Sequence, residues 1–251
     1  MDFVITSKDR QIVTVALRCP PVNSITEALT DELTATFRAL VDDPETKAVI
    51  VTGSDKFFSF GLDTPEFLSY SKESFVRFVT KWADLYTLVF LYPKPVVAAL
   101  NGHTMAGGCM LAIACDYRLM VTGKAKIGLN EINFGSSLFP GSVVMLAHCA
   151  GTRNAELISY TGAAYSAEEA KHLGLVDQVV SENDLMEKAF AVARGLADKH
   201  PPAFASIKML LRKHVSEDMR KKDEFYRKEL VDIWYSDHTW EQLKKIKIHS
   251  R

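Results

Sequence analysis

The chain has 251 residues, of which 47% are hydrophobic and 24% charged, and its formal net charge is -1. This length suits one large domain, or a domain with a smaller appendage, and the composition is ordinary for a globular protein. The near-neutral charge gives no sign of a nucleic-acid partner or of an anionic membrane surface. No apolar run approaches the roughly 18 residues of a membrane span, and the first ten residues lack a signal-peptide core.

The cysteines and histidines carry no recognisable site pattern. Cys19, Cys109, Cys115 and Cys149 lack the paired spacing of a zinc site, and the seven histidines include no H-E-x-x-H pair. We therefore expect no bound metal, and because G-x-S-x-G is also absent we expect no serine nucleophile. A disulfide framework is not expected in so long a chain, so reduced thiols and a cytoplasmic location are predicted. The C-terminal residues IHSR differ from the usual peroxisomal tripeptide.

Strands and helices alternate over the first half of the chain. Hydrophobic periodicity and the Pro and Gly positions predict these elements in order. They are two strands within residues 3–17 around a turn at Ser7–Arg10, a helix over 26–43, a strand over 48–53, a loop over 54–63, a helix over 72–92 and a strand over 95–102.

Further strands are predicted over residues 117–123 and 125–131, and the strand signal fades after about residue 190. The remaining pattern predicts helices over 185–202, 203–216 and 221–247. This alternation favours an α/β fold. We predict a core over residues 1–195 and a C-terminal helical extension over 196–251, packed on the core or on a neighbouring subunit.

The segment from Gly102 to Gly108 joins glycines to an apolar helix. Its spacing resembles a phosphate-binding loop, but Gly108 stands where that motif requires lysine, so this interpretation fails. Glycines at a helix start can instead let a ligand approach unpaired N–H groups at the positive end of the helix dipole. Such a helix start could stabilise an oxyanion. The other interpretation is that the glycines only permit tight packing.

Two further segments are candidates for chemistry. Glu131 lies among apolar residues, and a carboxyl group buried without a cation has a raised pKa that suits proton transfer. The alternative is an exposed carboxylate at a strand end. The loop from Lys56 to Asp63 could supply a second backbone donor, or its aromatic residues could simply belong to the core.

Three blocks in order, FFSFGLD (57–63), NGHTMAGGCMLAIACDYRLM (101–120) and IGLNEINFG (127–135), resemble the crotonase, or enoyl-CoA hydratase/isomerase, superfamily. The segment AEEAKHLGLVDQVV agrees with it, and the resemblance covers residues 3 to 210. CPPVNSI, AGGCMLAIACDYR and IGLNE are most similar to the Δ3,Δ2-enoyl-CoA isomerases. The resemblance implies a spiral of repeated ββα units with C-terminal helices, an acyl-CoA thioester substrate, no further cofactor, and a homotrimer or dimer of trimers.

The resemblance also implies roles for individual residues. It assigns the two backbone N–H groups that bind the thioester oxygen to Phe60 and Gly107, and the proton-transferring carboxylate to Glu131. Hydratases of the family have a second glutamate where this chain has Met110. The implied reaction is therefore isomerisation of a 3-enoyl-CoA to the trans-2-enoyl-CoA by one carboxylate, as in fatty acid oxidation. The substrate-binding residues implied in the same way are Gly61, Leu62, Asp63, Thr64, Met110, Asn130 and Phe139.

Two alternatives stay open at this point. The chain could be a hydratase or an acyl-CoA hydrolase in which Asp63 or Glu66 replaces the missing acid. It could also be a non-catalytic acyl-CoA-binding subunit of a trimer.

Assembly into trimers is favoured because the helical tail carries more aromatic residues than a peripheral helix should expose. These are Phe225, Tyr226, Trp234, Tyr235 and Trp240.

Overall fold

The computed structural model describes residues 2–246, whose strands form two sheets. The larger sheet has the strand order β1-β2-β3-β5-β7-β9, in which β1 pairs antiparallel with β2 and the other pairs are parallel. Its strands are β1 (Val4–Asp9), β2 (Ile12–Leu17), β3 (Ala48–Thr52), β5 (Val96–Leu100), β7 (Tyr117–Val121) and β9 (Gln178–Val180). The smaller, parallel sheet consists of β4 (Phe57–Ser59), β6 (His103–Met105) and β8 (Ile127–Gly128).

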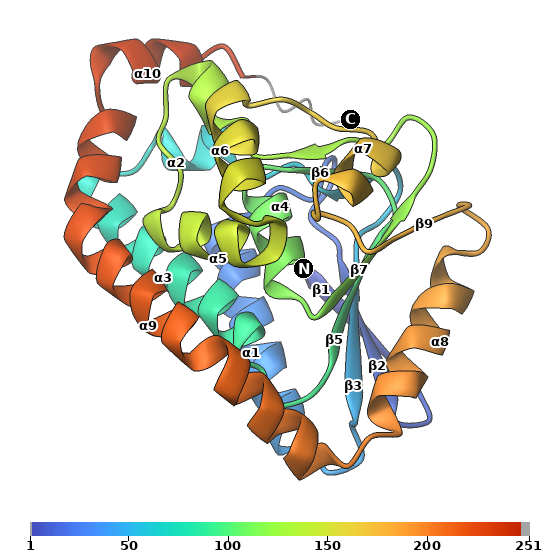
Figure 1. The fold of residues 1–251 in the computed structure, drawn as a ribbon. Helices are drawn as coiled ribbons and strands as arrows, with labels where there is room; N and C mark the ends of the chain where they lie inside the picture. Colours follow the sequence, from blue (N-terminus) through green and yellow to red (C-terminus); the bar gives the residue numbers. More distant parts are fainter. Residues whose placement is uncertain (1, 247–251) are drawn as a thin grey trace.

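The chain repeats a ββα unit. The strands β3, β5 and β7 of the larger sheet are each followed by a strand of the smaller sheet and then by helical structure. Successive units add neighbouring parallel strands to both sheets, so the backbone advances as a spiral (Figure 1). This arrangement confirms the predicted α/β fold of repeated ββα units. The strands β4 and β6 were not predicted, because three residues are too few to display an alternating pattern.

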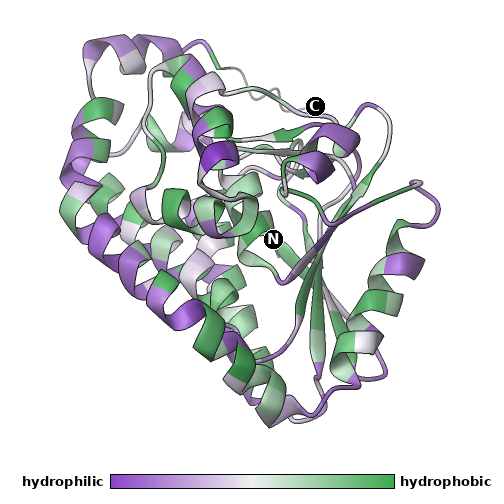
Figure 2. Ribbon diagram, in the orientation of Figure 1, coloured by the Kyte–Doolittle hydropathy of each residue, from purple (hydrophilic) through white to green (hydrophobic). Residues whose placement is uncertain are grey.

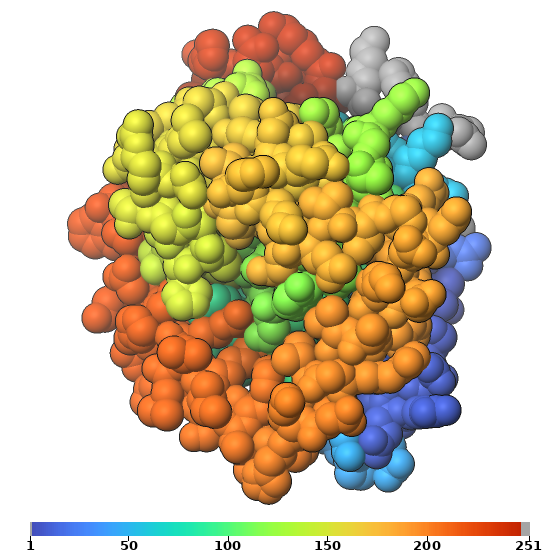
Figure 3. Space-filling model, turned by 45° about the vertical axis from the view of Figure 1, so that its right-hand side comes forward, coloured from blue at the N-terminus to red at the C-terminus, as the bar shows by residue number. Residues whose placement is uncertain are grey.

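Helices surround both sheets. They are α1 (Glu27–Asp42), α2 (Thr64–Phe67), α3 (Lys72–Phe90), α4 (Gly107–Ala114), α5 (Pro140–Ala150), α6 (Thr152–Thr161), α7 (Ala167–His172), α8 (Leu185–Ala197), α9 (Pro201–Trp234) and α10 (Asp237–Leu243), with a 3-10 turn η1 at Glu131–Phe134. The helix α8 packs on β3, β5 and β7, while α9 lies along α3 and α5. Figure 2 shows that the strands are largely hydrophobic, and Figure 3 shows α6, α7 and α8 covering one continuous part of the surface.

The C-terminal helices differ from the sequence prediction. The expected helices over 203–216 and 221–247 are one continuous helix, α9, followed by the short α10. The charged run between them is a solvent-exposed stretch of α9 and not a break, because it contains no Gly or Pro. The predicted division at residues 195 and 196 falls inside α8 and stays a prediction. Residue 1 and residues 247–251, including the C-terminal residues weighed for targeting, lie outside the described residues.

Three of the five tail aromatics pack within their own chain. Trp234 stacks on Phe75, with ring centroids 4.6 Å apart, and Trp240 stacks on Tyr235 at 5.0 Å. The expectation that all five form an exposed surface is therefore wrong for Trp234, Tyr235 and Trp240. Phe225 is 78% exposed and remains available to a partner.

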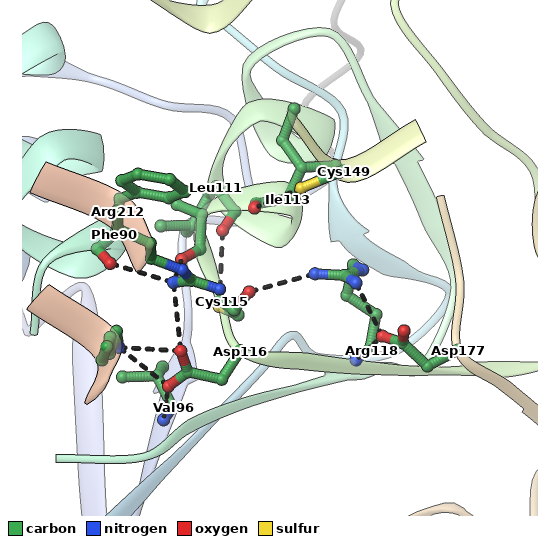
Figure 4. A network of polar contacts seen from close by, with 12 residues as sticks. Phe90, Val96, Leu111, Ile113, Cys115, Asp116, Arg118, Cys149, Asp177 and Arg212 are labelled. Atoms are coloured by element: carbon green, nitrogen blue, oxygen red, sulfur yellow. Dashed lines mark hydrogen bonds and ion pairs between the residues drawn. The ribbon is translucent and has the colours of Figure 1, made fainter. Parts of the chain in front are cut away.

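A buried ion cluster connects α9 to the end of α4. The Asp116 carboxylate accepts hydrogen bonds from the Val96 backbone N–H at 2.7 Å and from Lys208 at 2.8 Å, and Arg212 lies 3.0 Å from it. Figure 4 shows Asp116 between Val96 and Arg212. Arg212 also donates to the carbonyl of Ala114, the last residue of α4. Burial lowers the pKa of Lys208 to about 8. One carboxylate thus compensates two cations at this junction.

The sequence analysis also made expectations about membrane spans, metal sites and cysteines. Over residues 2–246, no helix combines the length and apolarity that a bilayer crossing requires. Within the same residues no group of three His, Cys, Asp or Glu side chains is arranged to hold a metal ion. The four cysteines are free thiols.

Candidate active site

A cavity of about 220 Å³ lies where the starts of α2, α4 and η1 meet the C-terminal helices. Polar and apolar side chains both contribute to its wall. The lining residues are Phe60, Leu62, Thr64, Ala106, Gly107, Asn130, Glu131, Asn133, Phe134, Ser136, Ser137, Phe139, Trp234 and Ile246. Half of these lining residues were predicted from the sequence. Most of the predicted site residues therefore lie together at this cavity.

Glu131 is the only carboxylate among the described lining residues. It is the first residue of η1 rather than the end of a strand, and it is 6% exposed. Its Oε2 atom is buried without a hydrogen-bond partner among residues 2–246. Burial raises the pKa of Glu131 to about 8, and no cation opposes this shift. A carboxyl group in this environment is suited to exchange a proton with a bound ligand.

The start of α4 presents its backbone to the cavity. Ala106 precedes the helix with a positive φ of 49° and a ψ of -121°, a conformation uncommon for a residue with a side chain, and it turns the chain before Gly107. The N–H of Gly107 is one of the unpaired donors of a helix start, at the positive end of the dipole. Gly108 is needed for packing, because a Cβ atom there would lie 2.4 Å from the carbonyl oxygen of Ser59. Gly108 thus fits the packing interpretation, while the Gly107 amide has the position that the oxyanion interpretation requires.

The second backbone donor is not the predicted one. The N–H of Phe60 donates to the carbonyl of Val22 at 3.1 Å, so it is not free to bind a substrate oxygen. The N–H of Leu62 has no hydrogen-bond partner among residues 2–246, and Leu62 lines the cavity. An ideal Cβ on Gly61, the residue before Leu62, would lie 3.3 Å from the Gly107 nitrogen. The pair of available amides is therefore Leu62 and Gly107.

Three predicted residues do not line the cavity. Met110 is fully buried in the core, and Gly61 and Asp63 lie behind the lining residues. The Asp63 carboxylate caps α2 by accepting from the Glu66 N–H at 3.1 Å, and it also accepts from Ser24. Glu66 in turn accepts from Tyr70 at 2.9 Å. Both carboxylates that could have replaced the missing acid are thus engaged in hydrogen bonds within the chain.

Several lining residues were not predicted individually. Trp234 is the last residue of α9 and Ile246 follows α10, so both lie more than a hundred residues after Glu131 in the sequence. Both belong to the predicted C-terminal extension over residues 196–251, which therefore contributes to the cavity wall. Phe134 and the nearby polar residues Asn133, Ser136 and Ser137 follow Glu131 directly. Their position in one short turn beside Glu131 was the signal that could have identified them.

Known proteins with similar sequences are enoyl-CoA hydratases and isomerases. A family model described as enoyl-CoA hydratase/isomerase matches residues 7–244. A probable enoyl-CoA hydratase of Bacillus subtilis is 31% identical over 215 residues, covering 84% of this chain and 82% of the relative. The mitochondrial enoyl-CoA delta isomerase 1 of Mus musculus is also 31% identical over 215 residues, covering 85% of this chain and 74% of the relative.

A solved structure gives the same assignment. The crystal structure of human mitochondrial Δ3,Δ2-enoyl-CoA isomerase superimposes with a TM-score of 0.91 at 27% identity, covering 97% of this chain and 96% of that one. This match confirms the crotonase-like spiral with its C-terminal helices. The chain is therefore a member of the enoyl-CoA hydratase/isomerase family of the crotonase superfamily.

Proposed function

We propose that this protein isomerises 3-enoyl-CoA thioesters to trans-2-enoyl-CoA thioesters, as in fatty acid oxidation. The observation that carries the proposal is the single buried carboxylate, Glu131, in a cavity that also presents the free amides of Leu62 and Gly107. A reaction that moves one proton between two carbons needs one base. Addition of water would need a second acid or base to orient the water, and position 110 is a buried methionine.

Proton transfer by Glu131 and hydrogen bonds from two backbone amides account for the whole reaction. The ionised carboxylate of Glu131 removes a proton from C2 of the 3-enoyl thioester, and the electrons of that C–H bond delocalise into the thioester carbonyl. The resulting dienolate carries negative charge on its oxygen, where the amides of Leu62 and Gly107 donate hydrogen bonds. Glu131 then returns the proton to C4, which leaves a double bond between C2 and C3. Losing one such donor typically costs about 3 kcal/mol of transition-state stabilisation.

The deciding experiment offers two substrates to the same preparation. We expect rapid conversion of 3-hexenoyl-CoA and only background hydration of 2-hexenoyl-CoA in coupled assays. Efficient hydration would favour the hydratase alternative, and release of free CoA would favour a hydrolase. Binding of both thioesters without turnover would favour a non-catalytic subunit.

The rate of isomerisation is expected to rise with pH. Glu131 must be ionised to act as base. Because its pKa is raised to about 8, the Glu131 carboxyl group of the free enzyme is mostly protonated at neutral pH. We expect kcat/KM to increase about tenfold per pH unit below that value and to level off above it. Initial rates from about pH 6 to pH 9.5 in buffers of constant ionic strength measure this. A flat profile across the range would contradict the assignment of Glu131 as the base.

Replacing Gly61 tests the paired amides. Gly61 has φ 98°, and a Cβ atom there would lie 2.8 Å from the Ala106 Cβ, beside the Gly107 amide. We expect Gly61→Ala to lower kcat by about a hundredfold by moving the two donors apart. Gly123→Ala is the matched control, because Gly123 has φ 101° with no atom within 4 Å of the added methyl. Equal rates for the two folded variants would argue against a Leu62–Gly107 oxyanion site.

We also propose that the acyl-CoA enzyme assembles as a homotrimer or dimer of trimers. The first half of α9 exposes four apolar side chains, and Figure 2 colours this end of the helix as largely hydrophobic. These are Ile207 (58% exposed), Met209 (41%), Leu210 (77%) and Leu211 (61%). Ile207, Leu210 and Leu211 share one helix face because they are spaced three and four residues apart. An exposed apolar face of this kind is typical of a subunit interface. Light scattering that gives a monomer mass at micromolar concentration would contradict the assembly.

A further inference from the structure

The first turn of α5 meets α3 and α9 at a buried junction. Asp223 on α9 accepts a hydrogen bond from the Gly141 backbone N–H at 2.7 Å and another from the Tyr86 hydroxyl at 2.9 Å. Asp223 is 6% exposed and Tyr86 is fully buried. Burial raises the pKa of Asp223, while the two hydrogen bonds act in the opposite direction. A carboxylate is thus held against a helix start where the dipole favours negative charge.

The junction has no spare room. A Cβ atom on Gly141 would lie 2.4 Å from the Asp223 Oδ2 atom and 2.8 Å from the Tyr86 hydroxyl oxygen. The first turn of α5 therefore cannot approach α9 more closely. Its N–H bond to Asp223 opposes movement in the other direction. The distance between α5 and α9 is fixed at this point from both sides.

The start of α5 and the end of α9 both contribute to the cavity wall. Phe139 immediately precedes α5, and its carbonyl accepts from both the hydroxyl and the N–H of Ser142, at 2.7 and 2.9 Å. Trp234 lies on α9, about three helical turns after Asp223. Phe139 and Trp234 both line the cavity. The separation of these two aromatic walls therefore depends on the separation of α5 and α9.

We propose that Asp223 is a positioning residue that sets the width of the apolar part of the cavity and thereby the acyl-chain preference. Asp223 itself does not line the cavity, so it acts through Gly141 and the adjoining Phe139. The inference rests on the proposed function in one respect, namely that the cavity receives the acyl group of a CoA thioester. It does not depend on which reaction follows.

Two substitutions at Asp223 distinguish the loss of its hydrogen-bond acceptor from the replacement of its charge. Leucine cannot accept a hydrogen bond from the Gly141 N–H, so we expect the first turn of α5 to move away from α9 and the cavity to widen. Asparagine keeps an acceptor for Gly141 and a polar partner for Tyr86. Asp218→Leu is the matched control, because Asp218 is exposed on the same helix.

The readout is the ratio of dissociation constants for hexanoyl-CoA and dodecanoyl-CoA, measured calorimetrically. Both thioesters are saturated and cannot be isomerised. We expect Asp223→Leu to shift this ratio toward the longer chain by at least about fivefold. Asp223→Asn and Asp218→Leu should stay within about 1.5-fold of the parent. A general loss of stability would not change the ratio in this selective way.

An unchanged ratio in folded Asp223→Leu, or equal shifts for leucine and asparagine, would overturn the positioning role. If Asp223→Leu does not fold, Tyr86→Phe is decisive, because it removes one of the two bonds and should shift the ratio in the same direction by at least about twofold. A parent that binds both thioesters but does not convert 3-enoyl-CoA would overturn the proposed reaction alone. A parent that binds neither would overturn both proposals.

Discussion

Glu131→Gln is expected to lower kcat for isomerisation by about a thousandfold or more while acyl-CoA binding changes little. Glutamine has the same shape but cannot accept the C2 proton, and no other carboxylate among the described lining residues can replace it. Glu66→Gln is the control, because Glu66 bonds to Tyr70 and does not line the cavity. Residual activity of Glu131→Gln within tenfold of the parent would contradict the single-base mechanism.

The same variant should be more stable than its parent at neutral pH. The pKa of Glu131 is about 8 when folded and near 4.5 when the chain is unfolded. Between these values the folded state binds more protons than the unfolded state, so the parent loses stability as pH rises. From pH 4.5 to pH 7 this loss is on the order of 3 kcal/mol, and glutamine does not incur it. Urea unfolding of both proteins at these two pH values measures the difference. An equal pH dependence for both proteins would show that Glu131 ionises as freely when folded as when unfolded.

Asp116→Asn is expected to destabilise the fold by about 3–5 kcal/mol. The amide retains an acceptor for the Val96 N–H but no longer compensates Lys208 and Arg212, whose side chains are 5% and 12% exposed. Two cations would then be buried together without an anion. Free energies of unfolding from denaturant titration test the expectation.

The chain offers a matched control for this charge cluster. Asp232 also lies between two lysines, Lys72 and Lys228, but the Asp232 side chain is 48% exposed. Because solvent screens such pairs, Asp232→Asn should cost only about 0–1 kcal/mol. Adding Lys208→Met to Asp116→Asn should recover part of the lost stability, since it removes one of the uncompensated charges. Similar costs for the two Asp→Asn variants would mean that water reaches the Asp116 cluster.

The long elements could be predicted from sequence because each shows a clear burial pattern. The helix over 26–43 is an example, since its apolar residues recur at helical spacing and Thr26 caps its start. The long helix α9 was divided in error because a charged, solvent-exposed face was taken for an interruption. Strands of three residues such as β4 carry too little periodicity to be recognised.

At the site, residue types could be predicted but not hydrogen-bond pairing. The glycines identified the helix start, and the apolar neighbours of Glu131 identified it as a buried carboxyl group. Which amide after β4 is free depends on Val22, which pairs with Phe60 from a segment nearly forty residues earlier. That pairing is tertiary and leaves no local pattern. The contribution of Trp234 to the cavity is likewise decided by where α9 ends on the folded core.

The burial of the α4 start also keeps the thiol of a neighbouring cysteine unreactive. Cys109 follows Gly108 in the first turn of α4 and is fully buried. Burial, and to a lesser degree the nearby Glu131 carboxylate, raises the pKa of the Cys109 thiol far above neutrality. A conjugated 2-enoyl thioester, the product under the proposed function, is an electrophile that reacts with thiolates rather than thiols. The enclosure that raises the pKa of Glu131 therefore also keeps Cys109 protonated, although Cys109 lies only two residues after Gly107 in the chain.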